Sequence, residues 1–318
     1  MKNNWGIMFS GQGAQKTGMG LDCYSSSPIF KTVIDNASDI LGWNVVDALK
    51  NQNDELSKTK FVQPSLVAVS VGLYKMLIHD VPNLNIKAYV GLSLGEYSAL
   101  IASQKLNFDD GMRLLKIRAN AMQKDSENVK SAMAAVLKPT DTEKITEICN
   151  QLSDGDELVQ IANYNSPSQV VLGGTERALE KALEEINEMN LAGKTIQLKV
   201  SGAFHTPLYQ NTKTILQKEL ENIAFTDNDQ MVFSNTTGKC FDQQTISEIL
   251  AKQVINPTHF NDCIINMINK CKVDSVLEIG SGKALTKFAK QIDPALKRSK
   301  IDSYRSYLKF IENMGENK

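Results

Sequence analysis

A serine between two glycines is the residue of this sequence best placed to act as a nucleophile. Ser93 lies in Gly91-Leu-Ser-Leu-Gly95, after the short, mostly apolar stretch 87–90 and before a helix-forming stretch. This G-x-S-x-G pattern is typical of a nucleophile elbow when a strand precedes it and a helix follows. The tight turn would expose the hydroxyl, the glycines would leave room for the neighbouring backbone, and the helix would aim N–H groups at developing negative charge. We therefore predict a strand, a turn at Ser93 and a helix.

A serine nucleophile needs a base, and the chain contains three histidines. His79 lies in a polar stretch that ends a helix, where we expect it to be solvated, and His259 is a weaker second candidate. His205 follows a glycine turn, a position where a histidine is more often structural, so its choice rests on the need for a base. Acidic residues between Ser93 and His205 fall mostly on helices that a triad would not use. We predict a dyad, with a backbone carbonyl orienting the imidazole.

The composition bounds the class of protein. The chain has 318 residues, a net charge of −1 and 42% hydrophobic residues, enough for one large core and a smaller one. Five scattered cysteines without C-x-x-C spacing indicate reduced thiols, neither a disulfide framework nor a zinc site. No signal peptide or membrane-length apolar run is evident. We expect a cytoplasmic protein with neither nucleic acid nor a membrane as partner.

The elements before and after the serine must position it. Residues 6–10 predict a buried strand, and the following Gly11-Gln-Gly-Ala-Gln15 is either a plain turn or a loop that presents N–H groups. Lys16 stands where a dinucleotide fingerprint needs its third glycine. Residues 27–50 and 64–79, with Pro64 at the start of the second range, have helical periodicity. A helix over 108–123 carries Arg118, which is either solvated or salt-bridged, or binds a ligand.

From about residue 126 the pattern changes to β-α-β-β-α-β. The strands are expected at 131–137, as a pair within 159–173 joined at 165–168, and at 195–200; the helices open at a capping box, Thr140-Asp-Thr-Glu143, and at Thr175. Met189 is expected on the apolar face of the second helix. This order predicts a ferredoxin-like subdomain at 126–198. It would be inserted in a larger α/β domain with a largely parallel sheet, formed by 1–125 and 199–318.

A last strand, glycine turn and helix lie at 275–286. The turn resembles a cofactor loop only superficially, and we interpret it as structural.

Six motifs together resemble those of the malonyl-CoA:acyl carrier protein transacylase family, in its order and spacing over nearly the whole chain. They are Gly11-Gln-Gly-Ala-Gln15, Gly91-Leu-Ser-Leu-Gly-Glu-Tyr-Ser-Ala-Leu100, Arg118 with Met122, Asn163-Tyr-Asn-Ser-Pro167 with Gln169, Gly202-Ala-Phe-His205 and Gln253-Val-Ile-Asn-Pro257. The resemblance implies an α/β-hydrolase-like large domain with the inserted subdomain.

The resemblance also assigns roles. Ser93 would be the nucleophile, His205 the base, and the backbone N–H groups of Gln12 and Leu94 the oxyanion hole. Arg118 would hold the malonyl carboxylate through two parallel hydrogen bonds. The backbone carbonyl of Gln253 would accept a hydrogen bond from the imidazole. Phe204 would limit the room at the substrate α-carbon, and Asn165 would be a supporting residue.

Three positions depart from the family pattern: Leu92 replaces the usual His, His259 an Arg or Gln, and Ser281 a frequent Pro.

The expected partners are malonyl-CoA and acyl carrier protein; no metal or cofactor is needed, and a monomer is expected. Lys283, Lys287 and Lys290 could face an acidic carrier or form a solvated helix face. The rivals are an acyltransferase that loads polyketide carriers, an acyl hydrolase that clears carriers, and a non-catalytic carrier-binding module.

Overall fold

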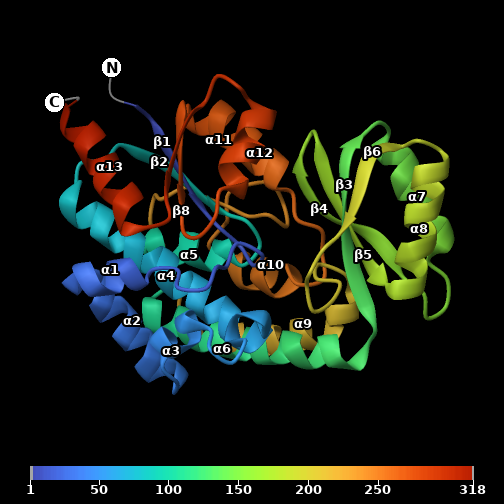
Figure 1. Cartoon of the computed structure of the whole chain (residues 1–318), viewed down its shortest axis with the longest axis horizontal. Coiled ribbons are helices and arrows are strands. Elements are labelled where there is room, and N and C mark those ends of the chain that lie inside the picture. Colours follow the sequence, from blue (N-terminus) through green and yellow to red (C-terminus); the bar gives the residue numbers. More distant parts are fainter. Residues whose placement is uncertain (1–2, 317–318) are drawn as a thin grey trace.

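Two separate β-sheets organise the chain in the computed structural model, which describes residues 3–316 (Figure 1). The larger sheet has the strand order β7-β2-β1-β8-β9, and every pairing in it is parallel. The parallel sheet confirms the predicted α/β class. Its strands are β1 (Trp5–Phe9), β2 (Ile86–Gly91), β7 (Val232–Phe233), β8 (Ser275–Ile279) and β9 (Lys297–Ile301).

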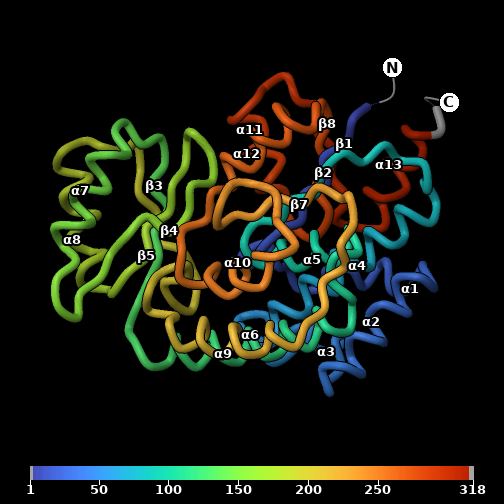
Figure 2. Tube along the Cα trace, turned by 180° about the vertical axis from the view of Figure 1, so that it is seen from behind, coloured from blue at the N-terminus to red at the C-terminus, as the bar shows by residue number. Residues whose placement is uncertain are grey.

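Helices cover both faces of the larger sheet, as buried parallel strands require. Side chains alternate along β1: Ile7 and Phe9 belong to the core with α2 and α4, whereas Met8 packs in a second cluster with α11 and α12. Figure 2 shows α9 running beside α6 at the lower edge of the molecule. The helices of this part are α1 (Leu21–Ser26), α2 (Pro28–Leu41), α3 (Val45–Lys50), α4 (Thr59–Asp80), α5 (Gly95–Ala102), α6 (Phe108–Asn128), α9 (Gln210–Leu220), α10 (Ile246–Lys252), α11 (Phe260–Cys271), α12 (Ala284–Ile292) and α13 (Tyr304–Glu316), with 3₁₀ turns η1 (Glu55–Ser57) and η2 (Pro207–Tyr209).

Helix α4 passes through the middle of the large core. It begins at Thr59, so the prediction that Pro64 opens this helix was wrong. Pro64 removes one backbone hydrogen bond, but the turn before it buries Val62 and Gln63, which favours the longer helix. Within residues 3–316 α4 is the single helix long and apolar enough to cross a membrane, and 83% of its apolar window is buried, as in a core helix.

The smaller sheet is formed between residues 131 and 197, in the order β4-β5-β3-β6 with antiparallel pairing throughout. Figure 1 shows α7 and α8 on its outer side, where a separate apolar cluster lies. This is the predicted βαββαβ unit. Its elements are β3 (Ser131–Pro139), α7 (Thr142–Leu152), β4 (Val159–Ser166), β5 (Gln169–Thr175), α8 (Glu176–Glu188) and β6 (Ala192–Gln197).

Several local predictions in the small sheet were wrong. Asp141, not Thr140, caps α7, because the N–H of Thr140 is bonded to Leu191 at the sheet edge. Met189 lies beyond the last turn of α8 and is 49% exposed. Strand β6 spans 192–197 instead of 195–200, because its pairing with β3 ends there.

Two further details concern the ends of elements. Thr175 stands at the N-cap position of α8, but its hydroxyl bonds Glu157 instead of capping the helix. The proposed division at 125/126 and 198/199 stays a prediction; α6 crosses the first boundary and ends at Asn128.

Candidate active site

The turn at Ser93 joins β2 to α5 and holds the serine at φ +52°, a left-handed conformation that is uncommon for residues other than glycine. The two glycines are needed because the backbone is crowded. A Cβ at Gly91 would lie 1.9 Å from the carbonyl carbon of Gly95, and one at Gly95 would lie 2.3 Å from the carbonyl oxygen of Phe9. The predicted strand, turn and helix are therefore present, with the close approach that the pattern implies.

His205 meets the serine hydroxyl. Its Nε2 lies 2.6 Å from Ser93 Oγ, and its Nδ1 lies 2.8 Å from the carbonyl oxygen of Gln253. A carbonyl accepts only, so Nδ1 carries the proton and Nε2 is the acceptor for the serine. Burial lowers the pKa of His205 to about 4, and the nearby charge of Arg118 lowers it further, whereas the bond to Gln253 opposes both effects. The imidazole is therefore neutral at pH 7, the form that can take a proton.

The other two histidines lie elsewhere. His79 is exposed at the end of α4, beside Asp80. His259 stacks on Tyr164, with ring centroids 5.0 Å apart, and faces Asp262. Neither contacts Ser93.

Arg118 is 1% exposed, so it is not a solvated residue. Its Nη1 donates to Gln63 Oε1 at 2.5 Å and its Nη2 to Gln253 Oε1 at 3.1 Å. Among residues 3–316 no carboxylate forms an ion pair with it, and its Nε has no hydrogen-bond partner. Burial lowers the pKa of Arg118, but a guanidinium keeps its proton. The guanidinium also lies over the ring of Tyr97, 5.6 Å from its centroid. A buried cation whose hydrogen-bond acceptors are neutral amides is a site for an anionic group.

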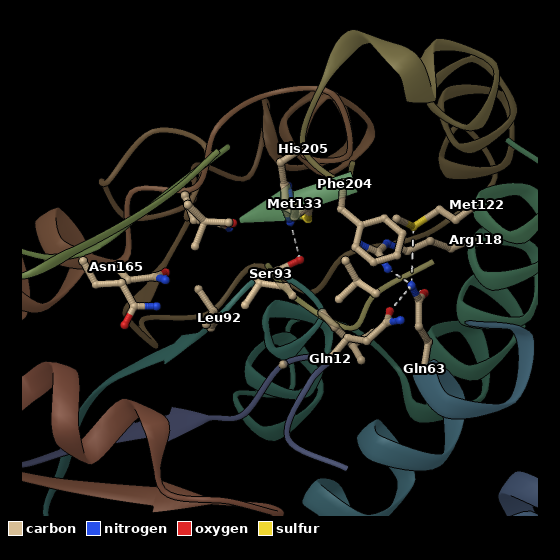
Figure 3. A pocket seen from close by; sticks show the side chains of 17 residues that line it. Gln12, Gln63, Leu92, Ser93, Arg118, Met122, Met133, Asn165, Phe204 and His205 are labelled. Atoms are coloured by element: carbon tan, nitrogen blue, oxygen red, sulfur yellow. Dashed lines mark hydrogen bonds between the residues drawn. The ribbon is translucent and has the colours of Figure 1, made fainter. Parts of the chain in front are cut away.

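One cavity brings the predicted residues together (Figure 3). Figure 3 shows Ser93 and His205 in its middle, Arg118 on one side with Gln63, and Asn165 on the other. The large domain supplies the nucleophile, base and guanidinium, and the small sheet supplies the facing wall. The lining residues are Gly11, Gln12, Gln63, Leu92, Ser93, Leu94, Arg118, Met122, Met133, Asn163, Asn165, Gln169, Val171, Leu198, Val200, Phe204 and His205.

The remaining predicted residues occupy distinct places around this cavity. The backbone N–H groups of Gln12 and Leu94 donate to no other described residue, as an oxyanion hole requires. Phe204 lines the wall next to His205 and packs on Tyr209 at 5.4 Å. Gln253 lies behind the dyad and reaches it through its carbonyl oxygen.

Asn165 and the three departures are also located. Asn165 is 5% exposed and its Oδ1 has no partner among the described residues. Leu92 lines the cavity beside Ser93. Ser281 belongs to the last glycine turn, where a Cβ at Gly280 would lie 2.4 Å from Ser10 Oγ; this turn does not line the cavity.

Sequence reasoning missed several residues that shape the site. Gln63 and Glu96 each left a signal, because each is a long polar residue inside a mostly apolar helix. Asn235 and Met133 left none, since they come from a loop after β7 and from the small sheet. Among the described residues, no group of three or more His, Cys, Asp or Glu side chains could hold a metal ion.

Comparison with known proteins agrees with this geometry. The sequence model of the acyl transferase domain matches residues 7–314. Malonyl CoA-acyl carrier protein transacylase of Haemophilus influenzae is 33% identical over 308 residues, covering 95% of this chain and 96% of the relative. The enzyme of the same name from Staphylococcus aureus MRSA252 is 30% identical over 309 residues, covering 96% and 98%.

A solved structure from Streptococcus pneumoniae, described as MCAT, has a TM-score of 0.91 and 35% identity, covering 98% of this chain and all of that one. The malonyl CoA-acyl carrier protein transacylase of Clostridium perfringens gives the same score and identity, with 98% of both chains covered. On this match of sequence, fold and site, the chain belongs to the malonyl-CoA:acyl carrier protein transacylase family of acyl transferase domains.

Proposed function

We propose that this protein transfers the malonyl group of malonyl-CoA to the phosphopantetheine thiol of acyl carrier protein, through a malonyl ester on Ser93. The observation that carries the proposal is Arg118: this buried guanidinium forms no ion pair with a carboxylate of residues 3–316 and opens on the cavity that holds the Ser93–His205 pair. A free carboxylate at the end of the acyl group would pair with the positive charge of this guanidinium.

In the first half-reaction, Nε2 of His205 takes the proton of Ser93 as Oγ attacks the thioester carbonyl. The N–H groups of Gln12 and Leu94 stabilise the oxyanion, and CoA leaves as a thiol after it receives the proton from His205. Arg118 holds the malonyl carboxylate during this step, so that the α-carbon faces Phe204.

In the second half-reaction, the carrier thiol enters the same cavity and gives its proton to His205. The thiolate attacks the serine ester, the new thioester forms and Ser93 recovers its proton. Because both acyl transfers use one site in turn, the mechanism is ping-pong. Neither step uses a metal or an organic cofactor.

The names of the relatives support this substrate pair. We propose that the transfer supplies fatty acid synthesis in the cytoplasm. One further structural neighbour favours a second candidate, the loading of polyketide carriers. It is described as a type II PKS acyl-carrier protein in complex with its malonyl-transacylase, with 29% identity and a TM-score of 0.91. Both candidates share the chemistry and differ in the carrier.

We further propose how the chain divides this work. Segments 1–125 and 199–318 form the domain that holds Ser93 and His205, and segment 126–198 supplies the wall with Met133 and Asn165. A monomer contains every residue that the proposed mechanism uses.

Transfer and hydrolysis are separated by one assay. Purified protein is given malonyl-CoA or acetyl-CoA, with or without a phosphopantetheine carrier, and both the acyl carrier and the free acid are measured. The proposal predicts carrier-dependent malonyl transfer with little hydrolysis. Rapid hydrolysis of both thioesters would favour the acyl hydrolase instead.

A further inference from the structure

A buried carboxyl group lies directly behind the reacting groups. Glu96 is fully buried in the first turn of α5, three residues after Ser93, near the positive end of the helix. One of its oxygens accepts a hydrogen bond from the backbone N–H of Asn235, and the other from Nε2 of Gln253. Both partners are N–H donors, so the oxygens of Glu96 accept from both. Burial raises the pKa of Glu96 to about 8, and these two hydrogen bonds and the charge of Arg118 oppose that rise.

The first branch from Glu96 runs through Asn235 to the nucleophile. Asn235 follows β7, the neighbour of β2, so the loops after these parallel strands meet at one sheet edge. Its Oδ1 accepts the backbone N–H of Ser93 at 2.7 Å. Its Nδ2 faces Cys263 Sγ at 3.7 Å and its carbonyl accepts the N–H of His259 at 2.8 Å. With all of its polar groups bonded, Asn235 holds the strained residue Ser93 in one orientation.

The second branch runs through Gln253 and reaches three groups. Nε2 of Gln253 donates to the carbonyl oxygen of Ser93 at 2.9 Å as well as to Glu96. Its carbonyl oxygen accepts Nδ1 of His205, and its Oε1 accepts Nη2 of Arg118. Because Arg118 only donates and Glu96 accepts, the orientation of the Gln253 amide is fixed by these two neighbours.

We propose that Glu96 and Asn235 are positioning residues. Asn235 holds the backbone N–H of Ser93, and Gln253, which is bonded to Glu96, holds the backbone carbonyl of Ser93. Through Gln253, Glu96 also positions the base His205 and the guanidinium of Arg118. The two branches differ in one respect. Asn235 contacts Ser93 but not Arg118, whereas Gln253 contacts both. The branches should therefore differ in their effect on the choice between malonyl and acetyl groups.

The proposal rests on the proposed function for one of its two readouts. The first readout is the rate of acylation of folded protein by malonyl-CoA and by acetyl-CoA. The second is the rate of labelling by a small fluorophosphonate, in which Oγ of Ser93 forms a bond to phosphorus, fluoride leaves, and His205 takes the serine proton. If malonyl-CoA does not acylate the wild-type protein, the proposed function fails, and the fluorophosphonate still tests the positioning.

Glu96→Gln replaces an accepting oxygen with a donating amide, and we expect both rates to fall about 10- to 100-fold. The malonyl-to-acetyl preference should fall as well, because Arg118 loses its fixed partner. Asn235→Ala should slow both rates about 10-fold and leave that preference unchanged.

Glu278→Gln is the matched control. Glu278 is 1% exposed and accepts two N–H groups at the start of α12, but it does not line the cavity. This variant should lose stability and keep the wild-type rates and preference. Equal losses in Glu96→Gln and Glu278→Gln, or a wild-type rate in folded Glu96→Gln, would overturn the proposal. If Glu96→Gln does not fold, an unchanged labelling rate in Asn235→Ala would overturn it.

Discussion

Oγ of Ser93 and Nε2 of His205 lie 2.6 Å apart, although 112 positions separate these residues in the sequence. The residues of the small sheet, 131–197, lie between them in the sequence, and after this sheet the chain comes back to the same cavity. The geometry allows direct proton transfer, and the acceptor nitrogen is fixed because Nδ1 is bonded to the carbonyl of Gln253.

Removal of the guanidinium should change substrate preference more than general activity. In Arg118→Ala we expect malonyl transfer to fall about 100-fold or more, since two charge-assisted hydrogen bonds are lost, and acetyl transfer to fall less than about 10-fold. Initial rates with the two thioesters measure this. Arg113→Ala is the control, because Arg113 is on the same helix but exposed, paired with Asp110. Equal losses for both thioesters in Arg118→Ala would show that Arg118 does not hold the malonyl carboxylate.

The acylation rate should persist in moderately acidic solution. Burial lowers the pKa of His205 from 6.5 to about 4, so the base stays neutral and active through pH 5 and is lost as the pH falls through about 4. The same shift stabilises the folded state fully above pH 6.5, and this contribution is lost as the pH falls toward 4, because the unfolded chain binds the proton first. Rapid-mixing rates between pH 4 and 8, with unfolding followed separately, test this; an acid limb centred at 6.5 would contradict it.

Phe204 should restrict the α-carbon of the acyl group, because its ring lines the cavity next to His205. We expect Phe204→Ala to raise the ratio of methylmalonyl to malonyl transfer about 10-fold, by giving room to one methyl group. Competition between the two thioesters measures the ratio. Phe288→Ala, which loses a ring of similar burial packed on Phe260, controls for general softening of the fold. An unchanged ratio in Phe204→Ala would place selectivity elsewhere.

The elbow should tolerate no side chain at its first glycine. A Cβ at Gly91 would overlap the backbone of Gly95 and Glu96, so Gly91→Ala should cost at least about 3 kcal/mol of unfolding free energy or prevent folding. Gly193→Ala is the control, because a Cβ there makes contacts of 3.4 Å or longer, and we expect a change within about 1 kcal/mol. Chemical denaturation gives both values, and similar values for the two variants would contradict the crowding at the turn.

The parts of the fold that follow from local pattern could be predicted. The elbow is set by two glycines and an apolar strand, and the small sheet by the order in which strand and helix patterns follow one another. Boundaries that depend on distant partners could not be predicted: β6 ends where its pairing with β3 ends, and α4 extends before Pro64 because Val62 and Gln63 become buried there.

The same limit applies to the site. Ser93, His205 and Arg118 belong to sequence motifs, whereas Asn235 reaches Ser93 across neighbouring strands and Met133 lines the cavity from the other sheet. Their roles depend on contacts between segments far apart in the chain, which no local pattern records.

The central claim is that Ser93 carries the malonyl group between the two thiols. Intact-mass analysis of the protein after brief exposure to malonyl-CoA, followed by peptide mapping, tests it directly. We predict the addition of one malonyl group on Ser93, absent in Ser93→Ala and removed when a phosphopantetheine carrier is added. A folded, wild-type sample that gains no acyl group, or gains it on another residue, would contradict the account.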